Sequence, residues 1–278
     1  MGLGGYLAWT AVAREISKKL PKDVKILPCE GDGKTVSKVV RSEVFENNPC
    51  ILIRVEKDVK AFPMFLNNPR ANYCKTDTPY KAHHRHDKHI IEQMCEFYNI
   101  ESPELRCELL FSKPEIEKVD KLCEGLEREF ITIEPYSKVN YTPNRTYPFE
   151  KWQSIVDDLA DKIQFVQVGT DEGELLNNVV DMRGRTSFRT AVLLIGKSKL
   201  FLSTEGGLVH AATAVDTTSL VIITGYQDEK MVAYPQNINV NIGTHGPCGL
   251  KIACNECRLD RDKHDYREIV KLIEANLK

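Results

Sequence analysis

The chain has 278 residues, a length typical of two domains and not of one small disulfide-stapled module. Its 38 lysines and arginines against 40 aspartates and glutamates leave a net charge of -2, so no overall basic field attracts nucleic acid or an anionic membrane. Hydrophobic residues make up 42%, which predicts a folded chain, and no apolar run is long enough to be an integral membrane segment. The sequence does not open on a secretory signal pattern, so we expect a cytoplasmic protein.

Helical and strand patterns alternate in the N-terminal half. An amphipathic helix is expected over residues 7–20, where Lys18 and Lys19 suit the negative end of the helix dipole and Pro21 ends the helix. The other elements expected here are two strands and two helices, at 23–28, 50–55, 86–98 and 113–126. Together they predict an N-terminal domain over residues 1–127.

The C-terminal half shows the same alternation more regularly. Its short Val- and Ile-rich runs lack strict alternation, as is typical of parallel strands covered on both faces. The expected elements are strands at 130–133, 163–168, 200–202 and 220–223, helices at 148–160, 187–195 and 208–215, and a closing helix at 264–277. The pattern predicts an α/β domain over residues 128–278 that binds ligands at the carboxyl ends of its strands.

The most informative segment is Thr204-Glu205-Gly206-Gly207, which runs from a buried strand directly into a helix. Two glycines permit a sharp turn and the close approach of a ligand, and the free N–H groups at a helix start attract phosphate oxygens. We interpret the segment as a diphosphate cradle. A tight turn without a ligand is the alternative.

A second polar segment follows the strand at 130–133. It holds Ser137 and Lys138, and Arg145 precedes the next helix. Lys138 and Arg145 could face one crevice, and an arginine suits bidentate contact with a phosphate. A solvated basic loop is the alternative.

Taken together, these segments resemble glycosyltransferase family 9, the heptosyltransferase family. The family's Asp-Ser/Thr-Gly-x-x-His motif is similar to the run from Glu205 to His210, and its Lys-x-Trp-Pro segment is similar to the run from Arg145 to Pro148. The likeness covers roughly residues 128 to 260, with further matches at Arg183-Gly184-Arg185-Thr186-Ser187 and, more loosely, at Gly4-Gly5-Tyr6-Leu7.

This resemblance implies a GT-B-like α/β architecture, in which two Rossmann-like domains with parallel sheets face a cleft. It further implies an inverting, metal-independent glycosyltransferase that needs no cofactor. Such an enzyme moves a sugar, for example a heptose, from a nucleoside-diphosphate donor to a bacterial glycan or protein acceptor. The C-terminal domain would hold most of the donor, and the oligomeric state stays open.

The resemblance also implies roles for particular residues. Arg145 would neutralise the charge of the departing diphosphate, and Glu205 would position the donor. The other donor-binding residues that we expect, from the resemblance and from their places after strands, are Gly4, Gly5, Ser137, Lys138, Gly169, Asp171, Gly206, Gly207 and His210.

Two departures from the family pattern concern the N-terminal half. The family carries Gly-Asp at its first loop, with the aspartate as general base, whereas this chain has Gly4-Gly5. Glu30 or Asp32, after the next strand, is the candidate base in its place. The family's first strand would precede Gly2, so we expect a short N-terminal domain without that strand.

Two other functions stay open at this point. The glycine at position 5 fits a catalytically silent homologue that binds a nucleotide sugar. The run from Gly2 to Gly5, with Glu30 after the next strand, is an incomplete fingerprint of an NAD-dependent oxidoreductase.

A cluster of Cys248, Cys254 and Cys257, with His245 and His264 nearby, is a candidate metal site. Structural zinc needs four ligands, and three reduced surface thiols in a loop are the alternative. The histidine-rich run at 83–89 is interpreted as a polar helix start, because consecutive helical positions point in different directions.

Overall fold

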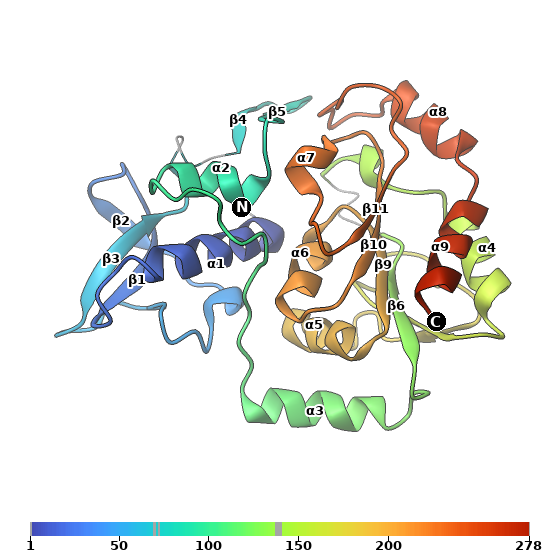
Figure 1. Cartoon of the computed structure of the whole chain (residues 1–278), viewed down its shortest axis with the longest axis horizontal. Helices are drawn as coiled ribbons and strands as arrows, with labels where there is room; N and C mark the ends of the chain where they lie inside the picture. The colour runs from blue at the N-terminus through green and yellow to red at the C-terminus, as the bar shows by residue number, and fades with distance from the viewer. Residues whose placement is uncertain (1, 69–70, 72, 137–140, 278) are drawn as a thin grey trace.

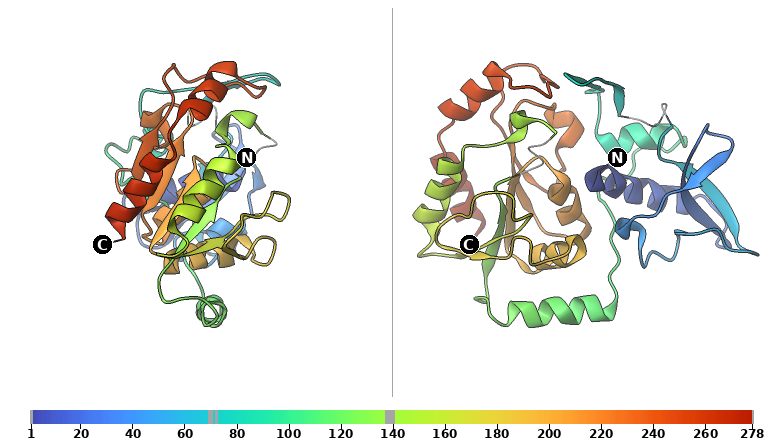
Figure 2. Two further views of the ribbon diagram at one scale, coloured as in Figure 1. Left: turned by 90° about the vertical axis from the view of Figure 1, so that its right-hand side faces the viewer. Right: turned by 180° about the vertical axis from the view of Figure 1, so that it is seen from behind.

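The computed structural model describes residues 2–68, 71, 73–136 and 141–277, and it shows an α/β fold built on two main sheets. Figures 1 and 2 show a smaller lobe around one sheet beside a larger lobe around the other, with a single helix running along one edge between them. No helix of the described residues is both long and apolar enough to cross a lipid bilayer.

The smaller lobe has a three-stranded sheet in the order β2-β1-β3, in which β1 pairs parallel to β3 and antiparallel to β2. A separate two-stranded hairpin, β4–β5, projects toward the larger lobe (Figure 1). The elements up to residue 127 are α1 (Leu3–Ser17), β1 (Val24–Gly31), β2 (Val36–Val39), η1 (Glu43–Phe45), β3 (Lys60–Phe65), β4 (Cys74–Asp77), β5 (Ala82–His84), α2 (Ile90–Glu96) and α3 (Lys113–Cys123).

The larger lobe has a six-stranded, all-parallel sheet in the order β11-β10-β9-β6-β7-β8. The chain starts at the central β6, moves outward to β8, returns to β9 and then moves outward the other way. Its elements are β6 (Phe130–Glu134), η2 (Pro143–Arg145), α4 (Phe149–Leu159), β7 (Gln164–Gln167), β8 (Val179–Asp181), α5 (Phe188–Lys197), β9 (Leu200–Thr204), α6 (Gly207–Ala214), β10 (Ser219–Ile223), α7 (Glu229–Val232), β11 (Ile238–Asn241), α8 (Asn255–Lys263) and α9 (Arg267–Asn276).

Apolar packing on both faces explains the sequence of the central strands. Every residue of β9 and β10 is buried. Alternate side chains, such as Phe201 and Leu202, enter two different cores, one beneath α5 and α6 and the other beneath α4 and α9. This confirms the α/β class and the parallel, doubly covered sheet predicted from the Val- and Ile-rich runs.

The prediction of a strand at 50–55 is wrong. Only Ile51 makes an isolated parallel bridge to Ile26, and Val55 is 69% exposed. The parallel partner of β1 is instead β3. Strand β3 was not predicted from the sequence because it contains Pro63, and proline removes a backbone hydrogen-bond donor. The proline is tolerated because β3 is an edge strand of its sheet.

The histidine-rich run is not a helix start over its whole length. His83 and His84 belong to β5, and the helix begins only at Ile90. His89 caps it through a reciprocal pair of bonds, since the N–H of Ile91 donates to its ring and its own N–H donates to the carboxylate of Glu92. The capping box therefore fixes the helix start six residues beyond His84.

The core continues across the expected domain boundary. Helix α1 packs against α6 of the larger lobe, and α3 packs against α5. The structure describes no strand ahead of α1, since its described residues begin at Gly2. The division between 1–127 and 128–278 stays a prediction.

One buried cation ties the lobes together. Arg189 of α5 has a side chain that is 6% exposed, and its Nε lies 2.6 Å from Oε1 of Glu115 on α3. The same guanidinium donates to the backbone carbonyls of Glu43 and Leu110. Its hydrogen bond to Glu115 holds the pKa of that carboxyl at about 2, far below the usual range.

Replacing this cation should destabilise the protein. Arg189→Met strands the Glu115 carboxylate and two carbonyls, and we expect a loss of roughly 2–4 kcal/mol in urea unfolding at pH 7. Because the pKa of Glu115 is lowered, its contribution is complete above about pH 4.5 and is lost as the pH falls toward 2. The wild type should lose this contribution on acidification and the variant should not. Lys113→Met, on the exposed face of α3, is the control, and equal stabilities of the two variants would contradict the account.

Candidate active site

The connections of the six-stranded sheet reverse direction between β6 and β9. Ligands of open parallel sheets bind in the crevice that such a reversal leaves at the carboxyl ends of the strands. Here β6 ends at Glu134, and β9 ends at Thr204, directly before Glu205. Two carboxyl groups therefore lie at the crevice. That of Glu205 was predicted from the sequence as part of the site, and that of Glu134 was not.

Glu205 is held inside the protein. It is 3% exposed, and its carboxylate accepts hydrogen bonds from the backbone N–H and the hydroxyl of Thr224 at 3.4 and 3.3 Å. Burial raises the pKa of Glu205 to about 7, against the opposing charge of Arg145. This carboxyl is therefore part protonated near neutral pH.

The start of α6 meets the start of α1 across the two lobes. A Cβ added at Gly4 would lie 3.2 Å from Cα of Gly207 and 3.2 Å from the His210 ring. Only glycine allows this approach without displacing a neighbour. The structure thus brings together four of the expected donor-binding residues, Gly4, Gly206, Gly207 and His210, beside the free N–H groups of a helix start.

Arg145 supplies the positive charge of this crevice. One guanidinium nitrogen donates to Gln227 at 2.5 Å, and the group lies over the ring of Tyr226 at 4.7 Å. Among the described residues no acceptor reaches its buried Nε. The positive charge of Arg145 opposes the rise that burial causes in the pKa of Glu205 and adds to the fall that burial causes in the pKa of His210, which places the guanidinium near both of them.

His210 of α6 has a half-buried ring. Its Nδ1 lies 2.6 Å from the hydroxyl of Tyr234. Burial first and the charge of Arg145 second lower the pKa of His210 to about 4. Near this ring the positive charge therefore comes from Arg145 and not from His210.

Sequence reasoning missed His84, which the smaller lobe contributes through β5. Its ring stacks on Tyr73 and lies edge-on to Tyr226, at 6.0 and 5.9 Å between ring centroids. Burial and the charge of Arg145 lower the pKa of His84 to about 4, and no described residue pairs with its buried Nδ1. The signal was present in the histidine-rich run, but the helical interpretation concealed it.

Glu134 was also missed. The Ser203 hydroxyl donates to its backbone carbonyl at 3.0 Å and approaches its carboxylate at 3.4 Å. Burial raises the pKa of Glu134 to about 8. Gly169, an expected donor-binding residue, lies beside it with a φ of +116°, and Asp171, another, follows in the same loop against Gly184.

Other expected site residues lie elsewhere. Ser137 and Lys138 fall outside the described residues. Glu30 and Asp32 lie on the β1–β2 hairpin, at the far side of the smaller lobe in Figure 1. The carboxylate of Asp32 caps its own turn by accepting from the N–H groups of Lys34 and Thr35.

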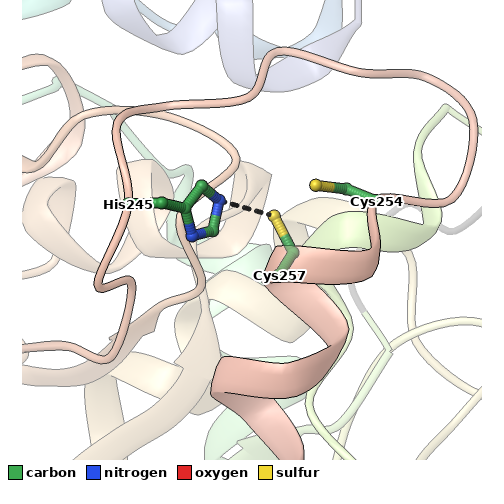
Figure 3. A group of neighbouring side chains, drawn as sticks. All are labelled: His245, Cys254 and Cys257. Carbon is green, nitrogen blue, oxygen red and sulfur yellow. Dashed lines mark hydrogen bonds between the residues drawn. The ribbon is translucent and has the colours of Figure 1, made fainter.

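The cysteine cluster forms a compact group. His245, Cys254 and Cys257 offer ligand atoms within 4.8 Å of one another. Figure 3 shows these three side chains pointing toward one another. Cys248 joins them, with its sulfur 3.4 Å from that of Cys257. The alternative of three surface thiols in a loop is wrong, because Cys254 and Cys257 are buried and begin helix α8.

The raised pKa of Glu134 makes stability depend on pH. A carboxyl whose pKa is higher in the folded state stabilises the fold below about pH 4.5 and loses that contribution as the pH rises through 8. Glu134→Gln stays neutral, so relative to wild type it should gain at least ~1 kcal/mol between pH 5 and pH 8.5 in urea unfolding. Glu172→Gln, at an exposed position, should show no such gain. A difference independent of pH would contradict the burial of this carboxyl.

Comparison with known proteins agrees with this geometry. A family model for glycosyltransferase family 9 (heptosyltransferase) matches residues 74–258, about two thirds of the chain. No curated protein matches the sequence.

Several solved structures share the fold. Heptosyltransferase II of E. coli superposes with a TM-score of 0.66 at 12% identity, over 99% of this chain and 96% of that one. A family 9 glycosyltransferase of Veillonella parvula gives 0.68 at 12% identity, over 100% and 94%. TibC of E. coli, described as a dodecameric iron-containing heptosyltransferase in complex with ADP-D-beta-D-heptose, gives 0.66 at 12% identity, over 100% and 75%. By its family match, and with a fold shared with these heptosyltransferases, this chain belongs to glycosyltransferase family 9.

Proposed function

We propose that this protein transfers a sugar from a nucleoside-diphosphate donor to an acceptor hydroxyl, with the diphosphate bound between Arg145 and the start of α6. The observation that carries the proposal is the half-buried guanidinium of Arg145 beside the carboxyl ends of β9 and β10, whose buried Nε has no partner among the described residues. A partly desolvated cation without a full set of acceptors gains free energy when an anion completes its hydrogen bonds.

The backbone of α6 supplies the second half of this anion site. Gly206 precedes the helix in an extended conformation and carries no side chain that could cap the first turn. The N–H groups of this turn therefore stay available to phosphate oxygens, and the helix dipole favours them by roughly 0.3–1 kcal/mol.

The departing diphosphate gains negative charge as the bond to the sugar breaks. Arg145 and the α6 N–H groups are preorganised to stabilise that charge without a metal ion. Glu205, held by Thr224, would orient the donor. We assign the reaction to inverting transfer in the cytoplasm, with ADP-heptose as the first donor to test because TibC was solved with that compound.

The general base that would activate the acceptor hydroxyl needs a separate proposal. Gly5 stands where the family has its general base, and Glu30 and Asp32 lie on the β1–β2 hairpin. If either supplies the base, the smaller lobe must bring that hairpin to the acceptor. We expect the amide variant of the active base to lose turnover while donor affinity stays unchanged.

Gly5 also favours a second candidate function, a homologue that binds a nucleotide sugar without transferring it to a bacterial glycan or protein. The two functions differ in a measurable way. Binding of ADP-heptose without transfer or hydrolysis over many hours, with a panel of glycan and peptide acceptors, would favour the silent homologue. Release of ADP that depends on an acceptor would favour the enzyme.

Calorimetric titration with ADP tests the proposed anion site. Arg145→Ala should weaken ADP binding at least tenfold, since a charge-assisted bond contributes roughly 1.5–3 kcal/mol when water is excluded. Arg267→Ala, on the exposed surface of α9, should bind as the wild type does. Thermal melting of both variants checks that folding is intact. Equal ADP affinity in Arg145→Ala would remove this residue from the site.

A further inference from the structure

Three metal-binding side chains outside the crevice, those of His245, Cys254 and Cys257, converge on one point, and a fourth, that of Cys248, lies beside Cys257. The His245 Nε2 lies 3.3 Å from the Cys257 sulfur, and the sulfurs of Cys257 and Cys248 lie 3.4 Å apart. Cys254 brings its sulfur within 4.8 Å of the ligand atoms of His245 and Cys257 (Figure 3). A disulfide would require about 2.05 Å between sulfurs, and all these thiols are free.

The spacing matches a tetrahedral metal site. With metal–sulfur bonds of about 2.3 Å and a metal–nitrogen bond of about 2.0–2.1 Å, neighbouring ligand atoms lie about 3.5–3.8 Å apart. The observed separations run from 3.3 Å to as much as 4.8 Å, so binding a metal needs the close contacts to open by a few tenths of an ångström and the wider ones to close by about 1 Å. Three thiolates and one imidazole are the ligand set that Zn²⁺ or Fe²⁺ prefers over Mg²⁺ or Ca²⁺.

The surroundings orient the histidine as a ligand. The carboxylate of Asp260 lies 2.8 Å from His245 Nδ1 and also accepts two hydrogen bonds from Thr244. When Nδ1 carries the ring proton and donates a hydrogen bond to Asp260, Nε2 is unprotonated. Its lone pair then points toward the cysteine sulfurs, where a metal ion would bind. Carboxylate support of this kind is the usual outer shell of a metal-bound imidazole.

The segment that carries these ligands, residues 245–257, also holds the peptide next to Arg145. The Asn144 amide donates to the carbonyls of Leu250 and Ile252, both at 2.8 Å. The N–H of Cys254 donates back to the Asn144 side-chain oxygen, also at 2.8 Å. The placement of the proposed diphosphate-binding cation therefore depends on the path of this segment.

The same segment also forms hydrogen bonds with residues on two other sides of the crevice. The N–H of Cys248 donates to the carbonyl of Gly225 and that of Gly249 to Tyr226, at 3.0 and 3.1 Å. On the opposite side, the N–H of Ala82 donates to Gly249 at 2.8 Å, which ties the β4–β5 hairpin of the smaller lobe to this segment. A Cβ at Gly249 would lie 2.4 Å from the Ala82 carbonyl, so the joint requires glycine there.

We propose that His245, Cys248, Cys254 and Cys257 bind one Zn²⁺ or Fe²⁺ ion, and that this ion fixes Arg145 and the β4–β5 hairpin in their positions around the crevice. The ion is structural and takes no part in sugar transfer. Without it, the described contacts that hold the segment in place are hydrogen bonds and the ion pair of Lys251 with Asp77, which local unfolding can open. Its consequence for nucleotide binding rests on the proposed function.

Metal analysis tests the ligand set directly. Untagged wild type should contain close to one equivalent of zinc or iron by mass spectrometry, and the element found decides between the two. Cys257→Ser should hold less than a tenth of an equivalent, and Cys123→Ser, a half-buried cysteine at the end of α3, should match the wild type. Cobalt substitution should give thiolate-to-metal charge-transfer bands in the wild type and in Cys123→Ser alone.

Hydrogen exchange tests the positioning role. Chelation of the metal from wild type avoids any folding defect of a variant, and it should speed amide exchange at least tenfold in residues 80–84 and 248–254 while α9 stays protected. ADP affinity should fall at least threefold on chelation and recover when the metal is restored.

The outcomes separate this proposal from the proposed function. Less than a tenth of an equivalent of metal in wild type, a Cys248–Cys257 disulfide found by mass mapping, or full metal content in Cys257→Ser would overturn the site. Unchanged exchange after chelation would overturn the positioning role. A further outcome is that wild type contains the metal and its amides exchange faster after chelation, but ADP does not bind at any stage. This outcome would confirm the present proposal and contradict the proposed function.

Discussion

The close approach of two helix starts, α1 at Gly4 and α6 at Gly207, is the constraint on which the rest of the site depends. Each helix belongs to a different lobe, and a Cβ at position 4 would lie only 3.2 Å from the facing backbone, so a side chain there would require the neighbours to shift by a few tenths of an ångström. The contact brings the smaller lobe to the carboxyl edge of the larger sheet. A larger residue at position 4 would have to displace Gly207 or the His210 ring, both of which lie at the crevice.

Within that crevice the charges are few and well defined. His210 and His84 are kept neutral by burial, and the two carboxyls at the ends of β6 and β9 have raised pKa values. Arg145 is thus the dominant charge of the described crevice at neutral pH. Such a balance suits an anionic ligand, because a diphosphate would meet a cation and a helix start beside carboxyl groups whose negative charge is reduced by their raised pKa values.

Much of the larger lobe could be predicted from sequence, because its strands are buried on both faces and read as continuous apolar runs. The expected segments at 130–133, 200–202 and 220–223 all correspond to strands of the sheet. The turn after β9 was found because glycines before a helix have a direct physical meaning. Apolar runs and turn glycines are patterns of neighbouring residues, and such patterns can be recognised in a single sequence.

The missed parts depend on contacts between distant residues. The β4–β5 hairpin is fixed by a bridge from Lys81 to Leu250, and nothing in the run around either residue indicates the other. His84 enters the crevice only through that hairpin. Glu134 has its unusual pKa because of how the sheet buries it, and the pairing of Asn144 with residues 250–254 spans more than 100 positions.

The central claim is that a diphosphate binds between Arg145 and the first turn of α6. A crystal structure of the protein soaked with ADP tests it most directly. The account predicts phosphate oxygens within hydrogen-bond distance of the Gly207 N–H and of the Arg145 guanidinium, with Arg145 Nε no longer unpaired. A diphosphate bound elsewhere, or bound with Arg145 still directed only at Gln227 and Tyr226, would contradict it.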